Sequence, residues 1–221
     1  MNLLARKPKQ LFSSRAEKKV MAQFADRLGL VYFGYVDQRD DDHRLVRGVT
    51  VSTQHKDNHY CIGSYEGYDI TLVRRSDVLA KANKTQKKHH EWLIMTFDIH
   101  LQVDLPHLFL GVHSRSDVFY SNLLTKFSHL TRVSLGTLGH YDASFIERYR
   151  LYSAPDQMLS ASRIIRPEVA TAMAQHFSGI DIEIHDGVVY IYSEHKSSQQ
   201  VLEKMLQCGL WFVRMIDSPA Q

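Results

Sequence analysis

The stretch Ile180–Glu194, IDIEIHDGVVYIYSE, decides the fold class of this protein. In its first half isoleucines alternate with acidic residues, and Asp186-Gly187 follows as a pair that type I′ turns favour. Alternation with a period of two is typical of a β-strand with two different faces. The stretch therefore predicts an antiparallel β-hairpin.

The same alternation marks a strand at Trp92–Val103. Its apolar positions are Leu93, Met95, Phe97, Ile99, Leu101 and Val103, and the polar positions between them are Thr96, Asp98, His100 and Gln102. This pattern predicts an antiparallel sheet with one face wet or only lightly covered. A further hairpin is predicted around Glu66-Gly67, within NHYCIGSYEGYDITLVRR (58–75), because glycine adopts the positive φ of a tight turn.

Helices are predicted near both ends of the chain. Ser14 and Glu17 have the spacing of a capping box at the start of a first helix. Ser197 or Ser198 begins the last helix, whose apolar side runs through residues 201–216. Hairpins mixed with helices predict an α+β fold: a mainly antiparallel sheet, helices packed on one face, and a long C-terminal amphipathic helix.

The length of the chain bounds its domain organisation. The chain has 221 residues, of which 44% are hydrophobic, and this is enough to bury a sizeable core. We predict a flexible basic arm over residues 1–13 and a single domain over residues 14–221. Two lobes, 14–127 and 142–221, are the alternative.

Charge and cysteine content indicate a cytoplasmic protein. The formal net charge is only +3, which does not by itself indicate a nucleic-acid or lipid partner. Cys61 and Cys208 stand far apart and outside any metal-binding spacing, so reduced thiols are expected. The longest apolar run, Leu28–Val36, is about half of the ~20 residues that a membrane-spanning helix needs. We therefore predict a cytoplasmic location and no membrane span.

One long segment carries a resemblance to a known family. Residues 145–194 read FIERYRLYSAPDQMLSASRIIRPEVATAMAQHFSGIDIEIHDGVVYIYSE, with an Arg-Tyr strand, a Ser-x-Pro-Asp turn, an RPE helix start and the isoleucine-rich hairpin. This segment resembles the C-terminal half of a bacterial family of uncharacterised α+β proteins, a domain of unknown function often carried beside membrane helices. GSYEGYDITLVRR (63–75) is similar to the G-x-Y-x-G hairpin of that family. The resemblance covers about half the chain and implies an α+β fold, but it assigns no activity and no site residue.

Two motifs have ligand types that bind metal ions, but neither has the required spacing. The stretch QRDDDHR (38–44) is rich in carboxylates, yet a calcium loop counted from Asp40 places Arg44 at position 5, where an oxygen ligand is needed. His55 and His59 have the spacing of two ligands on one helical face, but the Asp57-Asn58 pair between them favours a turn. We predict no metal site and no cofactor.

The densest basic region suggests a nucleic-acid contact. It comprises Arg74, Arg75, Lys84, Lys87, Lys88, His89 and His90. Cationic side chains near the tyrosines of the adjoining hairpin could hold a phosphate backbone and stack bases. A solubilising loop explains the same residues, and the sequence favours that interpretation.

Histidines on the best-patterned strand suggest a second candidate site. Asp98 and His100 share one face, and His107 and His113 join them if a strand at Leu105–His113 lies beside this one. Such a face could serve a hydrolase or a transferase. Because no nucleophile or orienting partner accompanies these residues, an ordinary wet surface is favoured and no catalytic residue is predicted.

The sequence therefore favours a non-catalytic binding or scaffolding module with a protein partner. A nucleic-acid contact through residues 74–90 is the first alternative. A hydrolase or transferase that uses the histidine-bearing face is the second.

Overall fold

One antiparallel sheet organises the protein in the computed structural model, which describes residues 8–36, 46–52, 55–80, 87–101, 104–138 and 140–218. Its strands are β1 (Val31–Phe33), β2 (Lys56–Tyr65), β3 (Tyr68–Ala80), β4 (Lys87–Asp98), β5 (Leu108–Val112), β6 (Thr131–Arg132), β7 (Tyr149–Ser153), β8 (Asp181–His185) and β9 (Val188–Ser193). The helices are α1 (Pro8–Leu28), α2 (Asp117–Leu123), η2 (Leu124–Lys126), α3 (Leu135–Leu138), α4 (Ala143–Arg148), η3 (Pro155–Gln157), α5 (Met158–Ile164), α6 (Pro167–His176) and α7 (Gln199–Asp217). This architecture confirms the predicted α+β fold.

The strand order is β1-β2-β3-β4-β9-β8-β5-β7-β6, and every pair is antiparallel. Both predicted hairpins are confirmed. Asp186 and Gly187 have φ values of 50° and 74°, and Glu66 and Gly67 have 51° and 88°, as two-residue type I′ turns require. The β8–β9 hairpin pairs with β4 on one side and β5 on the other, so strands from residues 14–127 and 142–221 share one sheet.

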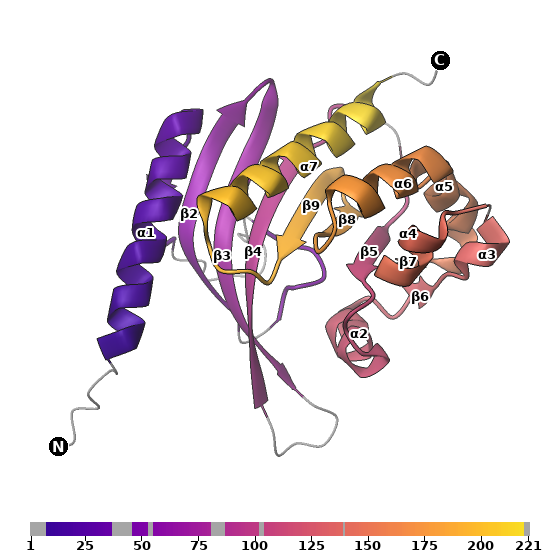
Figure 1. Ribbon diagram of the computed structural model, residues 1–221, viewed down its shortest axis with the longest axis horizontal. Helices are drawn as coiled ribbons and strands as arrows, with labels where there is room; N and C mark the ends of the chain where they lie inside the picture. The colour runs from indigo at the N-terminus through magenta and orange to yellow at the C-terminus, as the bar shows by residue number, and fades with distance from the viewer. Residues whose placement is uncertain are drawn as a thin grey trace.

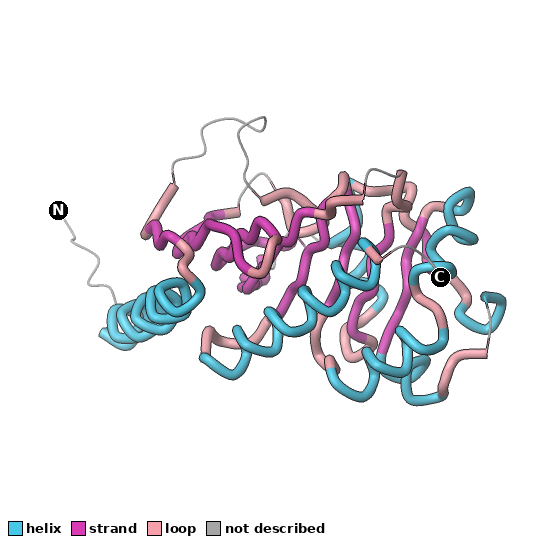
Figure 2. The backbone as a smooth tube through the Cα atoms, turned by 90° about the horizontal axis from the view of Figure 1, so that it is seen from above, coloured by secondary structure: helices cyan, strands magenta, loops and turns pink. Residues whose placement is uncertain are grey.

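The longer helices α1, α6 and α7 cover one face of this sheet. Figure 1 shows α7 crossing the sheet diagonally, with α1 along the edge beside β2 and α6 on the other side of α7. In Figure 2, α1 and α7 lie on the same side of the strands. The contact is close at Gly209 of α7, where an added Cβ would lie 1.9 Å from Cε2 of Phe97. The residues of β4 that face these helices are Leu93, Met95 and Phe97, as the alternation predicts.

The second face of the sheet is well covered, which corrects the prediction that it is wet or only lightly covered. On β4, Trp92, Ile94 and Thr96 are all buried, with exposed fractions of 1%, 0% and 5%. Their cover comes from α2, η2 and residues 46–50, whose apolar side chains form a second core with Trp92 and Ile94. A strand pattern reports only which residues alternate. It does not report whether a distant segment covers the polar face.

Two predicted boundaries are also wrong. The first helix begins at Pro8, before the predicted capping residue Ser14, and proline suits a first turn because it lacks an N–H that would have no intrahelical partner. The sequence also predicts a short strand over Leu45–Ser52, but the described part, residues 46–52, forms a turn around Gly48. Residues 1–7 of the predicted arm and the whole acidic stretch 38–44 lie outside the described residues.

Candidate functional site

Arg75 is the largest charged side chain inside the second core, with an exposed fraction of 0%. Its Nε and Nη2 donate to the two carboxylate oxygens of Asp57, each at 2.7 Å. The other three N–H groups donate to the hydroxyl of Thr50 at 3.0 Å and to the carbonyls of Val46 and Arg47 at 2.7 and 3.4 Å. All five guanidinium N–H groups are therefore used within the protein, and none is left for a phosphate.

Arg75 and Asp57 hold residues 46–50 against the sheet. The Asp57 carboxylate also accepts a hydrogen bond from the Tyr60 hydroxyl at 2.8 Å, and the Arg75 guanidinium holds the pKa of Asp57 below its usual value although burial raises it. Gly48 lies against the sheet with φ of 76°, and a Cβ there would be 2.2 Å from the Tyr192 hydroxyl oxygen. Only glycine fits both the conformation and the space.

Glu183 is also buried in this core, with an exposed fraction of 0%. Its Oε1 lies 2.8 Å from Nε2 of His107, and its Oε2 accepts the Val49 N–H at 2.9 Å and the Tyr192 hydroxyl. Burial first, and Glu183 second, raise the pKa of Tyr192 well above its ordinary value, so the hydroxyl stays a donor. Glu183 thus fixes residues 46–50 from the opposite side to Arg75.

Three imidazoles extend from Glu183 to the surface. His107 is buried, and its Nδ1 lies 3.0 Å from Nε2 of the exposed His129. The half-buried His185 stacks on His107 with ring centroids 4.1 Å apart, and Phe127 meets both rings edge-on. Burial and the neighbouring His107 lower the pKa of His185, which favours its neutral form at pH 7. We call His107, His129, His185 and Glu183 the histidine cluster.

Within the histidine cluster, both ring nitrogens of His107 are already paired. His107 uses one ring nitrogen for Glu183 and the other for His129, which leaves it no lone pair or proton for a substrate. Within the described ranges, no three His, Cys, Asp or Glu side chains are placed to hold one metal ion. The thiols of Cys61 and Cys208 are buried elsewhere, and burial raises the pKa of Cys61 to about 12.

The structure does not bring the predicted histidine face together. β9 and β8 lie between β4 and β5, so the two strands are not neighbours, which was the condition for His107 and His113 to join Asp98 and His100. Asp98 is exposed at the end of β4, where burial and Asp69 raise its pKa. His100 stacks on Tyr68 at 4.8 Å, whereas the Nδ1 of His113 lies 3.4 Å from the carbonyl of Ile146. Of the four residues, only His107 joins a cluster, and its partners come from η2–β6 and β8.

The predicted basic region is also divided. Arg74 is buried on the helix side of β3, where it contacts Glu17 at 3.4 Å, Glu91, and the carbonyl of His195 at 3.2 Å. Nδ1 of His90 lies 3.4 Å from a Glu194 carboxylate oxygen, whereas His89 is exposed. Lys87 and Lys88 belong to β4, and Lys84 lies outside the described residues. A nucleic-acid contact through these lysines and His89 stays a prediction.

An apolar surface lies along the edge of the described sheet that β1 forms. Val31, Phe33 and Tyr35 have exposed fractions of 57%, 42% and 66%, and their spacing places them on one face of the β1 segment. We call these three residues the edge surface. Among the described strands, β1 pairs with β2 alone.

The backbone of β1 also faces outward at the edge surface. The His59 N–H donates to the Gly34 carbonyl at 3.0 Å, and Gly34 continues the register in which Tyr32 pairs with Cys61. Hydrogen-bonded pairs alternate along an antiparallel ladder, so Tyr32 and Gly34 bond to β2. The N–H and C=O groups of Val31 and Phe33 therefore point away from β2.

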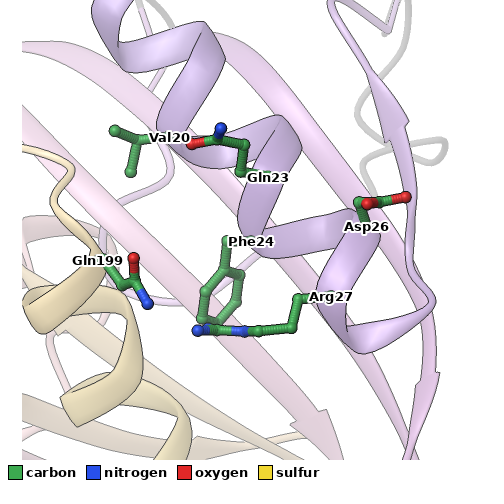
Figure 3. Close-up of a pocket in the computed structure, with 6 residues that line it drawn as sticks. All are labelled: Val20, Gln23, Phe24, Asp26, Arg27 and Gln199. Atoms are coloured by element: carbon green, nitrogen blue, oxygen red, sulfur yellow. The ribbon is translucent and has the colours of Figure 1, made fainter.

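A small pocket lies between α1 and α7 (Figure 3). Its volume is about 310 Å³, and Val20, Gln23, Phe24, Asp26, Arg27 and Gln199 line it. The Arg27 guanidinium stacks over Phe24 at 5.2 Å and pairs with Glu203 of α7 at 2.5 Å. These contacts neutralise the charge of Arg27 and join the two helices. The pocket is therefore a gap in the packing between α1 and α7.

Comparison with known proteins finds one solved structure with a similar fold. No family model matches the chain, and no curated protein does. The crystal structure of the mycobacterial trehalose monomycolate transport factor A, TtfA, has a TM-score of 0.61 at 13% identity, over 94% of this chain and 99% of that one. At this identity the likeness shows a shared fold. Among the described helices, none has both the length and the apolar character that a membrane span requires.

Proposed function

We propose that this chain is a non-catalytic binding module that docks another protein along β1. The observation that carries the proposal is the edge surface. Val31 and Phe33 present outward N–H and C=O groups in the plane of the sheet and exposed apolar side chains on its face. An extended strand of the partner, with apolar residues at alternate positions, satisfies both features by adding to the sheet.

Three further features support this proposal. The polar groups of the second core bind one another and position residues 46–50, which is a structural role. The protein of similar fold is titled a transport factor, a description that fits a protein acting through partners. Two buried free cysteines fit the cytoplasmic location that we propose with this function. We also propose that the chain is related to the bacterial family of unknown function that residues 145–194 resemble.

Site-specific photo-crosslinking in the native cell tests the docking surface. A photoreactive phenylalanine analogue at Phe33 should capture one protein, and the same analogue at Leu159 of α5, which is 66% exposed, should not. In the complex rebuilt from the captured protein, hydrogen exchange at the Val31 and Phe33 amides should slow. Equal capture at the two positions, or unchanged exchange, would contradict the proposal.

Two variants separate the backbone from the side-chain contribution. Val31→Pro removes an outward N–H, and Phe33→Glu places a charge in the apolar contact. Each should weaken the complex at least about tenfold, while Leu159→Glu leaves it unchanged. If the captured protein is a second copy of this chain, Phe33→Glu should convert a dimer to a monomer in sedimentation, and the proposal of a different partner would be wrong.

A further inference from the structure

The helix α1 lies beside the edge of the sheet that β1 forms. Figure 1 and Figure 2 both show α1 at that end of the sheet, and the two elements contact each other. The chain passes from α1 into β1 through a turn at Gly29, whose φ is 73°. A strand that adds to β1 lies about 4.8 Å further out in the plane of the sheet. Its side chains on the helix side of the sheet therefore lie next to α1.

α1 has an exposed stripe on the side that lies away from α7. Figure 3 shows the Arg27 side chain directed toward Gln199 of α7 and the Asp26 side chain directed away from it. Residues spaced three or four apart share one side of a helix. The stripe that ends at Asp26 therefore also contains Arg15, Lys18, Lys19 and Ala22. Its four charged side chains are exposed. We call these five residues the α1 stripe.

The α1 stripe carries a net positive charge. It has three cations and one anion, which are Arg15, Lys18, Lys19 and Asp26. Among the described residues, none of these four side chains takes part in an ion pair. The neighbouring Glu17 does not offset this charge, because its carboxylate already lies 3.4 Å from Nε of Arg74 and accepts the Ser197 hydroxyl at 2.9 Å. Exposed cations without partners favour acidic groups on a surface that docks against them.

Lys18 brings this positive charge to the edge surface. Burial chiefly lowers the pKa of His59, and Lys18 acts in the same direction although Glu17 opposes it, so Lys18 lies near this imidazole. The His59 N–H in turn donates to Gly34 of the β1 segment. Gly34 shares the face of Tyr32, which packs on the helix-side core. An added Cβ at Gly34 would have no atom within 4 Å, so the helix side of the edge is open at this point.

We propose that the strand that docks along β1 alternates apolar residues with acidic ones, an inference that rests on the proposed function. Its apolar residues lie against Val31, Phe33 and Tyr35, and the acidic residues between them lie against the α1 stripe. Because a shift of one residue exchanges the two faces of a strand, only one phase of the alternation satisfies both contacts. A strand with lysine or arginine at the acidic positions is excluded by charge.

Two synthetic peptides, VEVEVEV and VKVKVKV, test the charge preference. They share one apolar face and carry opposite charges on the other. Each is labelled and titrated with the full chain at low salt, and binding is followed by fluorescence anisotropy. The acidic peptide should bind saturably and at least about tenfold more tightly than the basic one. The difference should shrink in about 0.5 M NaCl, because salt screens exposed charges. Equal affinities at low salt would overturn the inference.

A charge reversal locates the preference on α1. Lys18→Glu should weaken binding of the acidic peptide at least about fivefold and strengthen binding of the basic one. The matched control is Lys126→Glu, at an exposed lysine of η2, which should change neither affinity. Both lysines are exposed, so the thermal unfolding midpoint should stay the same in both variants. Equal effects of the two substitutions would show that the overall charge of the chain sets the preference, and would overturn the inference.

Val31→Pro separates this inference from the proposed function. It removes an outward N–H of β1 without changing any charge, so both peptides should lose affinity. If both peptides bind equally and both lose affinity, docking along β1 stands and only the acidic preference is wrong. An acidic preference that survives Val31→Pro would place the peptides elsewhere and overturn the inference. The absence of saturable binding by either peptide would also overturn it, whereas crosslinking at Phe33 tests the docking by itself.

Discussion

At the scale of single residues, the buried ions explain why the polar signals in the sequence point to the wrong sites. Arg75 reads as part of a basic loop, yet the register of β3 directs it into the second core with Val73. Asp181 and Glu183 alternate with the isoleucines of the β8–β9 hairpin, and both have exposed fractions of 0%. Residue type indicates that an ion needs a partner. Where that partner comes from depends on segments distant in sequence.

The Arg75–Asp57 pair should be sensitive to loss of one charge. Asp57→Asn leaves a buried guanidinium without its counter-ion, so the free energy of unfolding should fall by about 3–5 kcal/mol. Urea denaturation measures this change. The control is Glu203→Gln, which breaks a partly exposed pair with Arg27 and should cost no more than about 1 kcal/mol. Equal effects of the two substitutions would show that the buried pair does not anchor the second core.

The histidine cluster predicts a specific pH dependence of stability. The folded state lowers the pKa of His185, chiefly through burial and then through His107 and His129, while Glu183 and Asp186 act in the opposite direction. Below its ordinary pKa of 6.5 the unfolded chain therefore binds a proton that the folded chain does not. The stability is fully present above pH 6.5 and is lost as the pH falls through the folded pKa.

Urea denaturation from about pH 7.5 to about pH 5.5 tests this dependence. The free energy of unfolding should fall more steeply for the unmodified chain than for His185→Gln, which cannot titrate at that position. Parallel pH profiles would mean that folding does not disfavour the charged form of His185.

At the scale of elements, alternation identified β4 and its core-facing residues Leu93, Met95 and Phe97, but β4 ends at Asp98, before the predicted Val103, and Leu101 is 39% exposed. The helix-facing side of β4 and both turn pairs follow the predicted phase. The opposite side of β4 also contains Trp92 and Ile94, two large apolar residues that a wet surface does not require. Those two residues were the available signal for a second core. They could not indicate α2 or residues 46–50 as its cover.

Gly209 tests how closely α7 packs on the sheet. Alanine favours a helix over glycine by about 1 kcal/mol, but its Cβ would overlap the Phe97 ring. Gly209→Ala should therefore destabilise the protein by about 1–3 kcal/mol in urea denaturation. In a Phe97→Leu background the same substitution should cost less, because the smaller side chain leaves room. A stabilising Gly209→Ala would contradict this close contact.

At the scale of the whole molecule, the β8–β9 hairpin joins the early and late parts of the chain. It lies between β4 and β5 in the sheet, although more than about sixty residues of sequence separate it from each of these strands. With this strand order, the early and late parts of the chain share hydrogen-bonded strand pairs, so neither part can unfold without disrupting the other. The chain should therefore unfold as one unit.

The two tryptophans report on opposite parts of that unit. Trp92 lies in β4 and Trp211 in α7, so Trp92→Phe and Trp211→Phe each leave one fluorescent probe. In each variant, the fluorescence of the remaining tryptophan and the circular dichroism signal should give the same urea midpoint. Two separate midpoints within one variant would favour the two lobes, 14–127 and 142–221.

Local patterns were sufficient for the two hairpins, their turns, the last helix and the α+β class, because these depend on neighbours a few residues apart. The strand order, the burial of Arg75 and Glu183, and the joining of His107 to His129 and His185 depended on contacts between segments about 20 to 130 residues apart. Those contacts are favourable because they bury apolar surface while every buried charged group keeps a partner. Many arrangements of the same strands satisfy the local patterns, and far fewer satisfy that condition.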